Sequence, residues 1–378
     1  MAPLVMQAAA PPQNQASSIV RLIAEGWTQL AAGDAGEAAA RGERALRLDP
    51  VNHHAIDLVL AAYATNRQDT RALDAYERWL SGSVDEDTSL LRSVATAYLN
   101  AFAANADPRL SLPALAALAA SGDTAALAEL RKRAAAGTAP PEIDAELAQH
   151  GDADALQRLQ SEVTSGNRAD KTASINALKS VGGRETHGII AQALHDPTPP
   201  SRIAAATALA DLGATDQLPT LHDALSDPDP RVRGMVQIAL ARLRDPQAGT
   251  SVQELLSSPV GEIRLVAVKT MAQEAPQGPW TATAEALLQD DDALVRIDAA
   301  RLLLEHDVPS AGAARETLRA ALADPTPGVR SRAAEAVRML VTSGERMEPK
   351  ILRSLLRDRL LEVRLEAARA LMRSGTPR

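Results

Sequence analysis

The chain has 378 residues, more than one compact core normally holds, and only 2% of them are aromatic. Alanine is the most frequent residue, and Ala, Leu, Arg and Glu favour helix, which argues against an all-β or a Rossmann-type fold. The net charge of -8 argues against a surface made for nucleic acid, and the absence of cysteine excludes disulfide scaffolds and thiolate metal sites. No run of about 18 apolar residues occurs, so we expect an all-α protein without a membrane span.

The first 17 residues have a composition of their own. They begin MAPLVMQAAAPP, a short apolar stretch with small residues that resembles the tail of a secretory signal. The alternative is a disordered Ala/Pro/Gln leader without a targeting role. The first interpretation predicts a periplasmic or secreted protein and the second a cytoplasmic one. Under both, we expect residues 1–17 to lie outside the fold.

Residues 18–106 differ from the rest, because six of the seven aromatic residues precede residue 103. Gly33, Asp34 and Ala38, followed by ALRLDP, resemble the second helix and exit of a tetratricopeptide (TPR) repeat. Ala72 stands 34 residues after Ala38, which is the TPR period. The resemblance implies two TPR units at 19–86, and a third helix is predicted at Thr88–Ala104.

Residues 107–151 form a transition. The stretch LAASGDTAALAELRKRAAAG from Leu118 aligns with LAQHGDADALQRLQSEVTSG from Leu147. This self-similarity predicts one or two degenerate helical repeats ahead of a more regular array.

From residue 152 to the end, one motif recurs at steps of 31 to 34 residues. A basic residue follows six positions after the first residue of each copy, as in DPDPRVRGMVQIALARL from Asp227. Lys171 extends this ladder backwards, and Ser258 replaces Asp in one copy. The ladder residues are Asp196, Arg202, Asp227, Arg233, Arg264, Asp290, Arg296, Asp324, Arg330, Asp358 and Arg364.

Each period holds two amphipathic stretches, for example Asp216–Ser226 and Arg231–Leu243, with apolar residues at helical spacing. Such a pair cannot bury its own apolar stripe, so pairs must stack side by side. The pattern L-x-x-L-x-x-x-L-x-D-P-x-x-x-V-R-x-x-A-x-x-A-L resembles the HEAT repeat, in the short variety typical of bacterial proteins labelled phycobilisome-lyase-like. The resemblance implies a right-handed α-solenoid of about seven repeats over 152–378.

The ladder has a structural and a functional interpretation. Structurally, each Asp caps the second helix and each Arg bonds the neighbouring repeat's Asp and turn. Ser258 would then deprive Arg264 of one carboxylate. Functionally, the row would bind anions or phosphate. The spacing is that of the repeat itself, which favours the structural interpretation.

No motif for catalysis is present. The seven histidines show no metal-ligand spacing, and no G-x-S-x-G, P-loop or Rossmann fingerprint occurs. We therefore predict no enzyme activity, no catalytic residue, no metal site and no cofactor.

The surface suggests partners instead. After residue 312 there are 14 Lys and Arg against 8 Asp and Glu, a basic end on an acidic chain. Such polarity favours docking to an acidic partner or self-association through the two ends. The resemblance to HEAT folds implies that the second helices line a concave side. The expected contact residues there are Thr207, Arg242, Lys269, Arg301, Arg338, Arg369 and Arg373.

The sequence thus predicts a non-catalytic scaffold or adaptor that binds protein or peptide through its concave side. Two alternatives come from related HEAT families. One is a phycobilin-lyase-like protein that handles a chromophore, which the scarcity of aromatic residues disfavours. The other is a DNA-binding HEAT-like protein, which the acidic balance disfavours.

Overall fold

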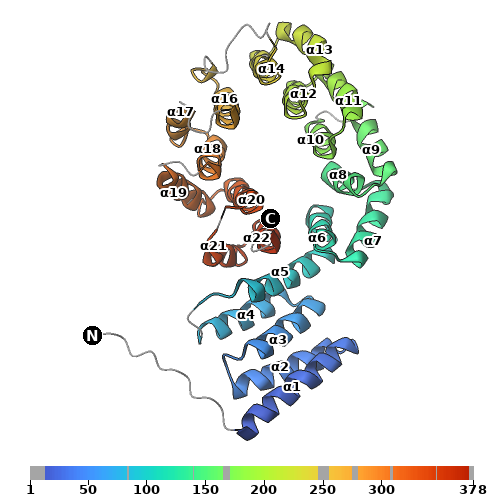
Figure 1. The fold of residues 1–378 in the computed structure, drawn as a ribbon, viewed down its shortest axis with the longest axis vertical. Helices are drawn as coiled ribbons and strands as arrows, with labels where there is room; N and C mark the ends of the chain where they lie inside the picture. Colours follow the sequence, from blue (N-terminus) through green and yellow to red (C-terminus); the bar gives the residue numbers. More distant parts are fainter. Residues whose placement is uncertain are drawn as a thin grey trace, which may run out of the picture. The chain divides into compact units, whose positions relative to one another are not determined.

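The computed structural model describes residues 13–82, 85–138, 140–164, 171–245, 255–274, 280–306, 310–345 and 347–373. All regular elements within these ranges are helices, and the chain is an all-α helical repeat (Figure 1). None of these helices is long and apolar enough to span a membrane. The chain divides into two compact units, which do not follow the domain boundaries expected from the sequence. Unit 1 combines Met1–Ser121 with Arg346–Arg378, and unit 2 is Gly122–Glu345.

The first part of unit 1 is a run of antiparallel helices. They are α1 (Gln13–Ala31), α2 (Ala35–Leu48), α3 (His53–Thr65), α4 (Asp69–Leu80), α5 (Thr88–Ala103) and α6 (Pro108–Ala120). Side chains at their starts bind the open backbone amides, as when Asp34 accepts from the Glu37 N–H at 2.9 Å. The predicted third helix, Thr88–Ala104, corresponds closely to α5.

The leader is shorter than expected. We expected residues 1–17 outside the fold, but α1 begins at Gln13. The Gln15 side-chain amide donates to the Leu48 carbonyl at 2.8 Å, which gives a partner to an open carbonyl at the end of α2. Residues 1–12 lie outside the described residues, and so does the segment on which the secretory-signal interpretation depends.

The last two helices, α21 (Pro349–Leu355) and α22 (Leu361–Arg373), complete unit 1. Helix α22 packs against α5 and α6. The buried Tyr98 of α5 donates its hydroxyl to the Leu356 carbonyl at 3.1 Å. The hairpin expected to end the HEAT array is therefore built into the same unit as the start of the chain.

Ion pairs hold this C-terminal hairpin to the N-terminal helices. Arg353 contacts Glu86 at 2.9 Å and Glu77 at 3.2 Å. Arg357 contacts Asp74 at 2.5 Å and Glu77 at 2.7 Å. Part of the basic surplus at the C-terminus thus finds its acidic counterpart within the same chain.

Unit 2 is a curved two-layer array of helices (Figure 1). The inner layer includes α10 (Thr172–Val181), α12 (Pro199–Asp211), α14 (Pro230–Arg242), α16 (Gly261–Glu274), α18 (Ala293–Glu305) and α20 (Pro327–Ser343). The outer layer includes α9 (Ala153–Thr164), α11 (His187–Gln192), α13 (Leu218–Asp223), α17 (Trp280–Leu287) and α19 (Ala311–Leu322). Helices α7 (Thr124–Arg133) and α8 (Pro141–Gln149) precede this array.

Two sequence features shape these pairs. Pro199, Pro230 and Pro327 each begin an inner helix, where a missing N–H costs no hydrogen bond. One outer helix is shorter than expected: the stretch predicted as one helix at Asp216–Ser226 is α13 between two 3₁₀ turns. The core between the layers is rich in buried alanine, as the composition predicts, and α12 alone buries Ala204, Ala205, Ala206, Ala208 and Ala210.

Candidate partner-binding surface

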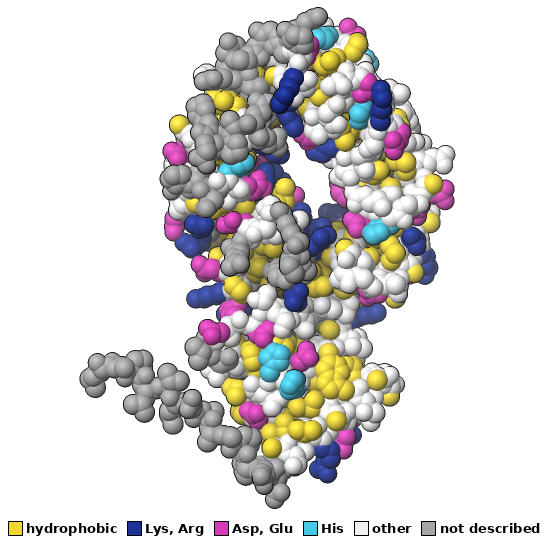
Figure 2. Space-filling view, viewed as in Figure 1, with side chains coloured by type: hydrophobic (Ala, Val, Ile, Leu, Met, Phe, Trp, Pro, Cys, Tyr) yellow, Lys and Arg dark blue, Asp and Glu magenta, His cyan; other side chains and the backbone are white. Residues whose placement is uncertain are grey.

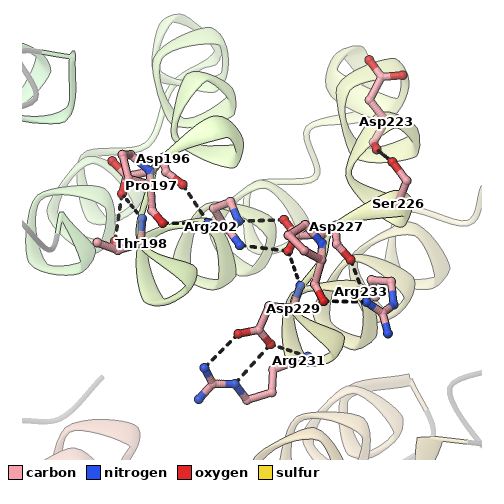
Figure 3. A network of polar contacts seen from close by, with 11 residues as sticks. Asp196, Pro197, Thr198, Arg202, Asp223, Ser226, Asp227, Asp229, Arg231 and Arg233 are labelled. Atoms are coloured by element: carbon pink, nitrogen blue, oxygen red, sulfur yellow. Dashed lines mark hydrogen bonds and ion pairs between the residues drawn. The ribbon is translucent and has the colours of Figure 1, made fainter.

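The Asp/Arg ladder joins consecutive repeats of unit 2 (Figure 3). Arg202 donates from Nε and Nη2 to both carboxylate oxygens of Asp227 in the next repeat, at 2.7 and 2.9 Å. Its Nη1 donates to the carbonyls of Asp196 and Pro197 in its own turn. Arg202 and Asp227 are each only 9% exposed. The Arg202 guanidinium group thus forms its hydrogen bonds within the fold, which supports the structural interpretation of the ladder.

The ladder aspartates do not cap the inner helices as expected. Asp227 accepts from the Asp229 N–H at 2.8 Å, and it is Asp229 that caps α14 by accepting from the Arg231 N–H at 2.8 Å. The helix begins at Pro230, three residues after the ladder Asp. The ladder carboxylate therefore closes the turn, while the residue two positions later caps the helix.

The effect of Ser258 also differs from the expectation. Lys171, Arg202 and Arg264 each pair with the Asp of the following repeat, so Arg264 does have a carboxylate partner, Asp290, at 2.9 Å. Ser258 instead leaves Arg233 without a ladder carboxylate ahead of it, and among the described residues Arg233 bonds the Asp227 and Pro228 carbonyls. Lys171 follows the rule and contacts Asp196 at 3.3 Å.

The remaining ladder arginines of unit 2, Arg296 and Arg330, bond backbone carbonyls. Arg296 bonds the carbonyls of its own turn, and a hollow of about 270 Å³ is lined by both Arg296 and Asp324 of the next repeat. Arg330 likewise bonds the Asp324 and Pro325 carbonyls. The last rung, Asp358 and Arg364, lies in unit 1, where Asp358 accepts from the Leu360 N–H.

A second set of charged residues lies on the inner layer of unit 2. Asp211 of α12 contacts Lys179 of α10 at 2.9 Å and Arg242 of α14 at 2.6 Å. Burial opposes ionisation of Asp211, but the hydrogen bonds from Lys179 and Arg242 outweigh it and lower the pKa of the carboxyl. One carboxylate thus connects two cations, one from the preceding and one from the following repeat.

Lys269 of α16 is the exposed member of this set. Its side chain reaches solvent, yet desolvation by the surrounding protein, and then the nearby Arg301 charge, lower the pKa of its ammonium group. Exposure together with desolvation is expected for a side chain in a hollow rather than on a flat face. Lys269 forms no ion pair with a described residue. Arg301 of α18 is 7% exposed and pairs with Glu305 on its own helix.

We call these six residues the inner charged row: Lys179, Asp211, Arg242, Lys269, Arg301 and Glu305. Four cations against two anions leave a positive surplus on a chain that is negative overall. Lys269 interacts electrostatically with Lys179, Asp211, Arg301 and Glu305, so the row is continuous over the inner helices.

The sequence identified part of this row. Of its expected contact residues, Arg242, Lys269 and Arg301 belong to the row, and Thr207 and Arg338 lie on inner helices α12 and α20. The Thr207 hydroxyl donates a hydrogen bond to the Ile203 carbonyl. Arg369 and Arg373 lie on α22 in unit 1, where Arg369 pairs with Glu366. The set of seven is therefore not one surface within a single unit.

Sequence reasoning missed Lys179 and Asp211. Lys179 stands eight positions after Lys171, and Asp211 nine after Arg202. Arg242 also stands nine positions after its ladder residue, Arg233. Counting from the ladder to these positions in every repeat would have found both.

Residues 186–272 match the family model of HEAT repeats. This part of the chain consists of HEAT repeats. The matched residues include α11 to α14 and most of α16, and with them three ladder arginines that bond their own turns and three residues of the inner charged row. The HEAT match thus covers the region in which the ladder and the row were described.

The chain was also compared with solved structures and with curated proteins. The complex of CpcE and CpcF of phycocyanin lyase from Nostoc sp. PCC7120 aligns at 18% sequence identity and a TM-score of 0.37. The alignment covers 66% of this chain and 95% of that chain. No curated protein matches the chain. Among the described residues, no group of three or more His, Asp or Glu side chains is placed to hold a metal ion.

Proposed function

We propose that the protein is a non-catalytic scaffold whose HEAT repeats bind an acidic segment of a partner protein along the inner charged row. The observation that carries the proposal is the state of Lys269, an exposed ammonium group that lies among the cations of the inner charged row and forms no ion pair with a described residue. A cation that its own fold leaves unpaired and partly desolvated gains most from an anionic partner.

The surroundings of Lys269 make the attraction selective. Arg242 and Lys179 are held by Asp211, and Arg301 is held by Glu305, so these cations keep fixed positions around the exposed lysine. A partner carboxylate at Lys269 therefore meets a positive field without first ordering several flexible side chains.

The test is affinity capture of the tagged full-length protein from its native cells, followed by cross-linking and mass spectrometry. We expect Lys269→Glu to lose the captured partner and cross-links to map it to α14, α16 and α18. The matched control is Arg319→Glu, the same charge reversal on the outer helix α19, where the side chain is 58% exposed and pairs only along its own helix. That control should retain the partner.

Other results would replace the proposal. Capture that is equal for wild type and Lys269→Glu would place the contact elsewhere on the chain. A purified duplex DNA that binds with the same sensitivity to Lys269→Glu would make the partner a nucleic acid. A change in the visible absorbance of an added bilin that Lys269→Glu abolishes would favour a chromophore-handling role.

A further inference from the structure

A second surface, in unit 1, has the composition of a docking site and is independent of the inner charged row. A groove of about 200 Å³ runs between α2 and α4 with α3 beneath it. Its apolar lining comes from Leu46, Pro50, Val59, Ala75 and Trp79. This volume is below the roughly 300–1,000 Å³ of small-molecule sites, so it suits one or two side chains rather than a cofactor.

Exposed apolar residues continue from the groove to the surface. Leu48 at the end of α2 is 38% exposed and Val51 in the next turn is 37% exposed. Val51 reaches the end of α4, because its Cγ1 lies 2.8 Å from where a Cβ on Gly82 would stand. Figure 2 shows hydrophobic side chains gathered on the face of these N-terminal helices that is turned to the viewer. A continuous apolar patch of this kind is typical of interaction sites.

Four arginines surround the groove. Arg47 and Arg78 line it, and Arg44 and Arg71 are exposed on the same two helices. None of the four forms an ion pair with a described residue. Arg71 and Arg78 both lie on α4, and both act electrostatically on Tyr63.

The groove's own carboxylate, Glu43, forms no ion pair with a described residue. Glu43 accepts the hydroxyl hydrogen of Tyr63. Burial, followed by this bond, raises the pKa of Tyr63 to about 12, so the phenol keeps its proton and holds Glu43 in place. The groove is therefore an apolar slot with unpaired guanidinium groups at its edge.

Two acidic residues of helix α4, unlike its two arginines, form ion pairs with described residues of the chain. Its acidic residues Asp74 and Glu77 are covered by Arg357 and Arg353 of the chain's own C-terminal hairpin. Its basic residues Arg71 and Arg78 meet no such counterpart among the described residues. Asp74 lies on the same side of α4 as Arg71 and Arg78 but pairs with Arg357, so an acidic partner would meet the two arginines without a competing ion pair among the described residues.

We propose that the groove between α2 and α4 binds an acidic amphipathic segment of a partner protein. A large aliphatic or aromatic side chain would occupy the slot, and carboxylates on either side of it would reach Arg47 and Arg78. The walls come from the second helix of each expected TPR pair, so the site is separate from the first-helix face of α1 and α3. With the inner charged row, it would give the protein two places to hold partners.

The probe is a phage-displayed library of random 12-residue peptides, selected on the full-length protein and depleted on the Arg47→Glu/Arg78→Glu double variant. We expect the enriched peptides to be acidic and to carry a large apolar residue. A synthetic copy of the best one should bind at least tenfold more weakly to either single charge reversal at low salt, with a smaller loss at high salt.

Two further variants separate the groove from its surroundings. Ala75→Met fills the slot without changing charge and should weaken the same peptide, and circular dichroism checks that the helices persist. Arg21→Glu, on the exposed face of α1, and Lys269→Glu in unit 2 should leave its affinity unchanged. Because Lys269→Glu tests the HEAT surface alone, failure of one proposal is distinguishable from failure of the other.

The proposal is overturned if no peptide is enriched, or if the enriched peptides are neutral or basic. It is equally overturned if affinity survives both arginine reversals in a folded protein. Binding that depends on Arg21 would move the site to the first-helix face. Concentration-dependent self-association in sedimentation, abolished by Arg47→Glu, would make the occupant a second copy of this chain and refute the partner-protein assignment.

Discussion

The ladder offers a comparison between two arginines in the same sequence position. Arg202 and Arg233 each stand six residues after a ladder Asp and each bond two carbonyls of their own turn. Arg202 additionally holds Asp227 through two hydrogen bonds, whereas Arg233 faces the repeat in which Ser258 replaces Asp. Replacing each by alanine therefore isolates the ion pair between repeats.

We expect Arg202→Ala to be the more damaging change. It leaves Asp227, which is 9% exposed, with a backbone N–H as its remaining bond, and breaking a buried pair in this way costs about 3–5 kcal/mol. Arg233→Ala frees two carbonyls at a partly exposed turn, where water replaces the guanidinium, at about 1 kcal/mol. The difference of about 2–4 kcal/mol corresponds to roughly 30-fold or more in a local opening equilibrium.

Native-state hydrogen exchange measures this opening, because each repeat of an array contacts mainly its neighbours. Amides of α12 and α14 should exchange much faster in Arg202→Ala than in Arg233→Ala. The double variant Arg202→Ala/Asp227→Ala should be less damaged than Arg202→Ala alone, since no unpaired carboxylate remains. Equal exchange in the two single variants would show that the pair adds nothing to the carbonyl bonds.

The pH dependence gives a second check. Burial opposes ionisation of Asp227, but the bonds from Arg202 and the Asp229 amide outweigh it, so the pKa of the carboxyl is lowered. The pair's contribution is complete above the ordinary Asp pKa of about 3.9 and is lost as the pH falls through the lowered value. The difference between the two variants should therefore shrink in acid.

Three further predictions concern unit 1. Arg353→Glu places a carboxylate beside Glu86 and Glu77, and limited proteolysis should then cut the C-terminal hairpin faster than in wild type; unchanged cleavage would mean that apolar packing alone holds it. Asp87, whose pKa is lowered to about 2 because bonds from Ser89, Leu90 and His53 outweigh its burial, should contribute about 1–2 kcal/mol to stability. Urea titrations should show that contribution above pH 4 and its loss as the pH falls towards 2, but no such loss in Asp87→Asn. Gly42→Ala should destabilise, because a Cβ there would lie 2.6 Å from Val59 Cγ2, whereas Gly36→Ala, where a Cβ would meet only an ordinary contact with Asp34 Oδ1 at 3.6 Å, should stabilise by about 0.5–1 kcal/mol in thermal melts. Equal melting shifts would contradict the close α2–α3 approach.

The sequence predicted the features that repeat and missed those that occur once. The Asp-to-Arg spacing, the helix pairs and the alanine-rich core recur in every period, so a local pattern is enough to recognise them. The sequence did not show which neighbouring repeat supplies the carboxylate partner of each ladder arginine. Only the structure shows that Arg264 pairs with Asp290 of the following repeat, and that Ser258 therefore removes the partner of Arg233. The bond from Tyr98 to Leu356 depends on two complementary surfaces that are far apart along the chain, and no periodicity encodes it.

The candidate surfaces show the same limit. Arg242, Lys269 and Arg301 of the inner charged row were expected because the HEAT resemblance places the second helices on the concave side, whereas Lys179 and Asp211 were missed. The groove between α2 and α4 gives no motif, because its character depends on which charges the fold leaves unpaired. Arg78 and Glu77 are adjacent in sequence, yet Glu77 forms an ion pair with Arg353 while Arg78 forms no ion pair with a described residue.

The placement of α22 against α5 has a consequence for biosynthesis. Tyr98 and Leu356 are 258 positions apart, and a ribosome adds about 5–20 residues per second, so α5 waits roughly 13–50 s for its neighbour. During that interval the first helices to emerge keep an uncovered side, whereas unit 2 receives all its helices without interruption. The N-terminal unit is thus the last to be completed. A nascent chain that stops after residue 345 would contain a whole unit 2 and a unit 1 that no later event could finish.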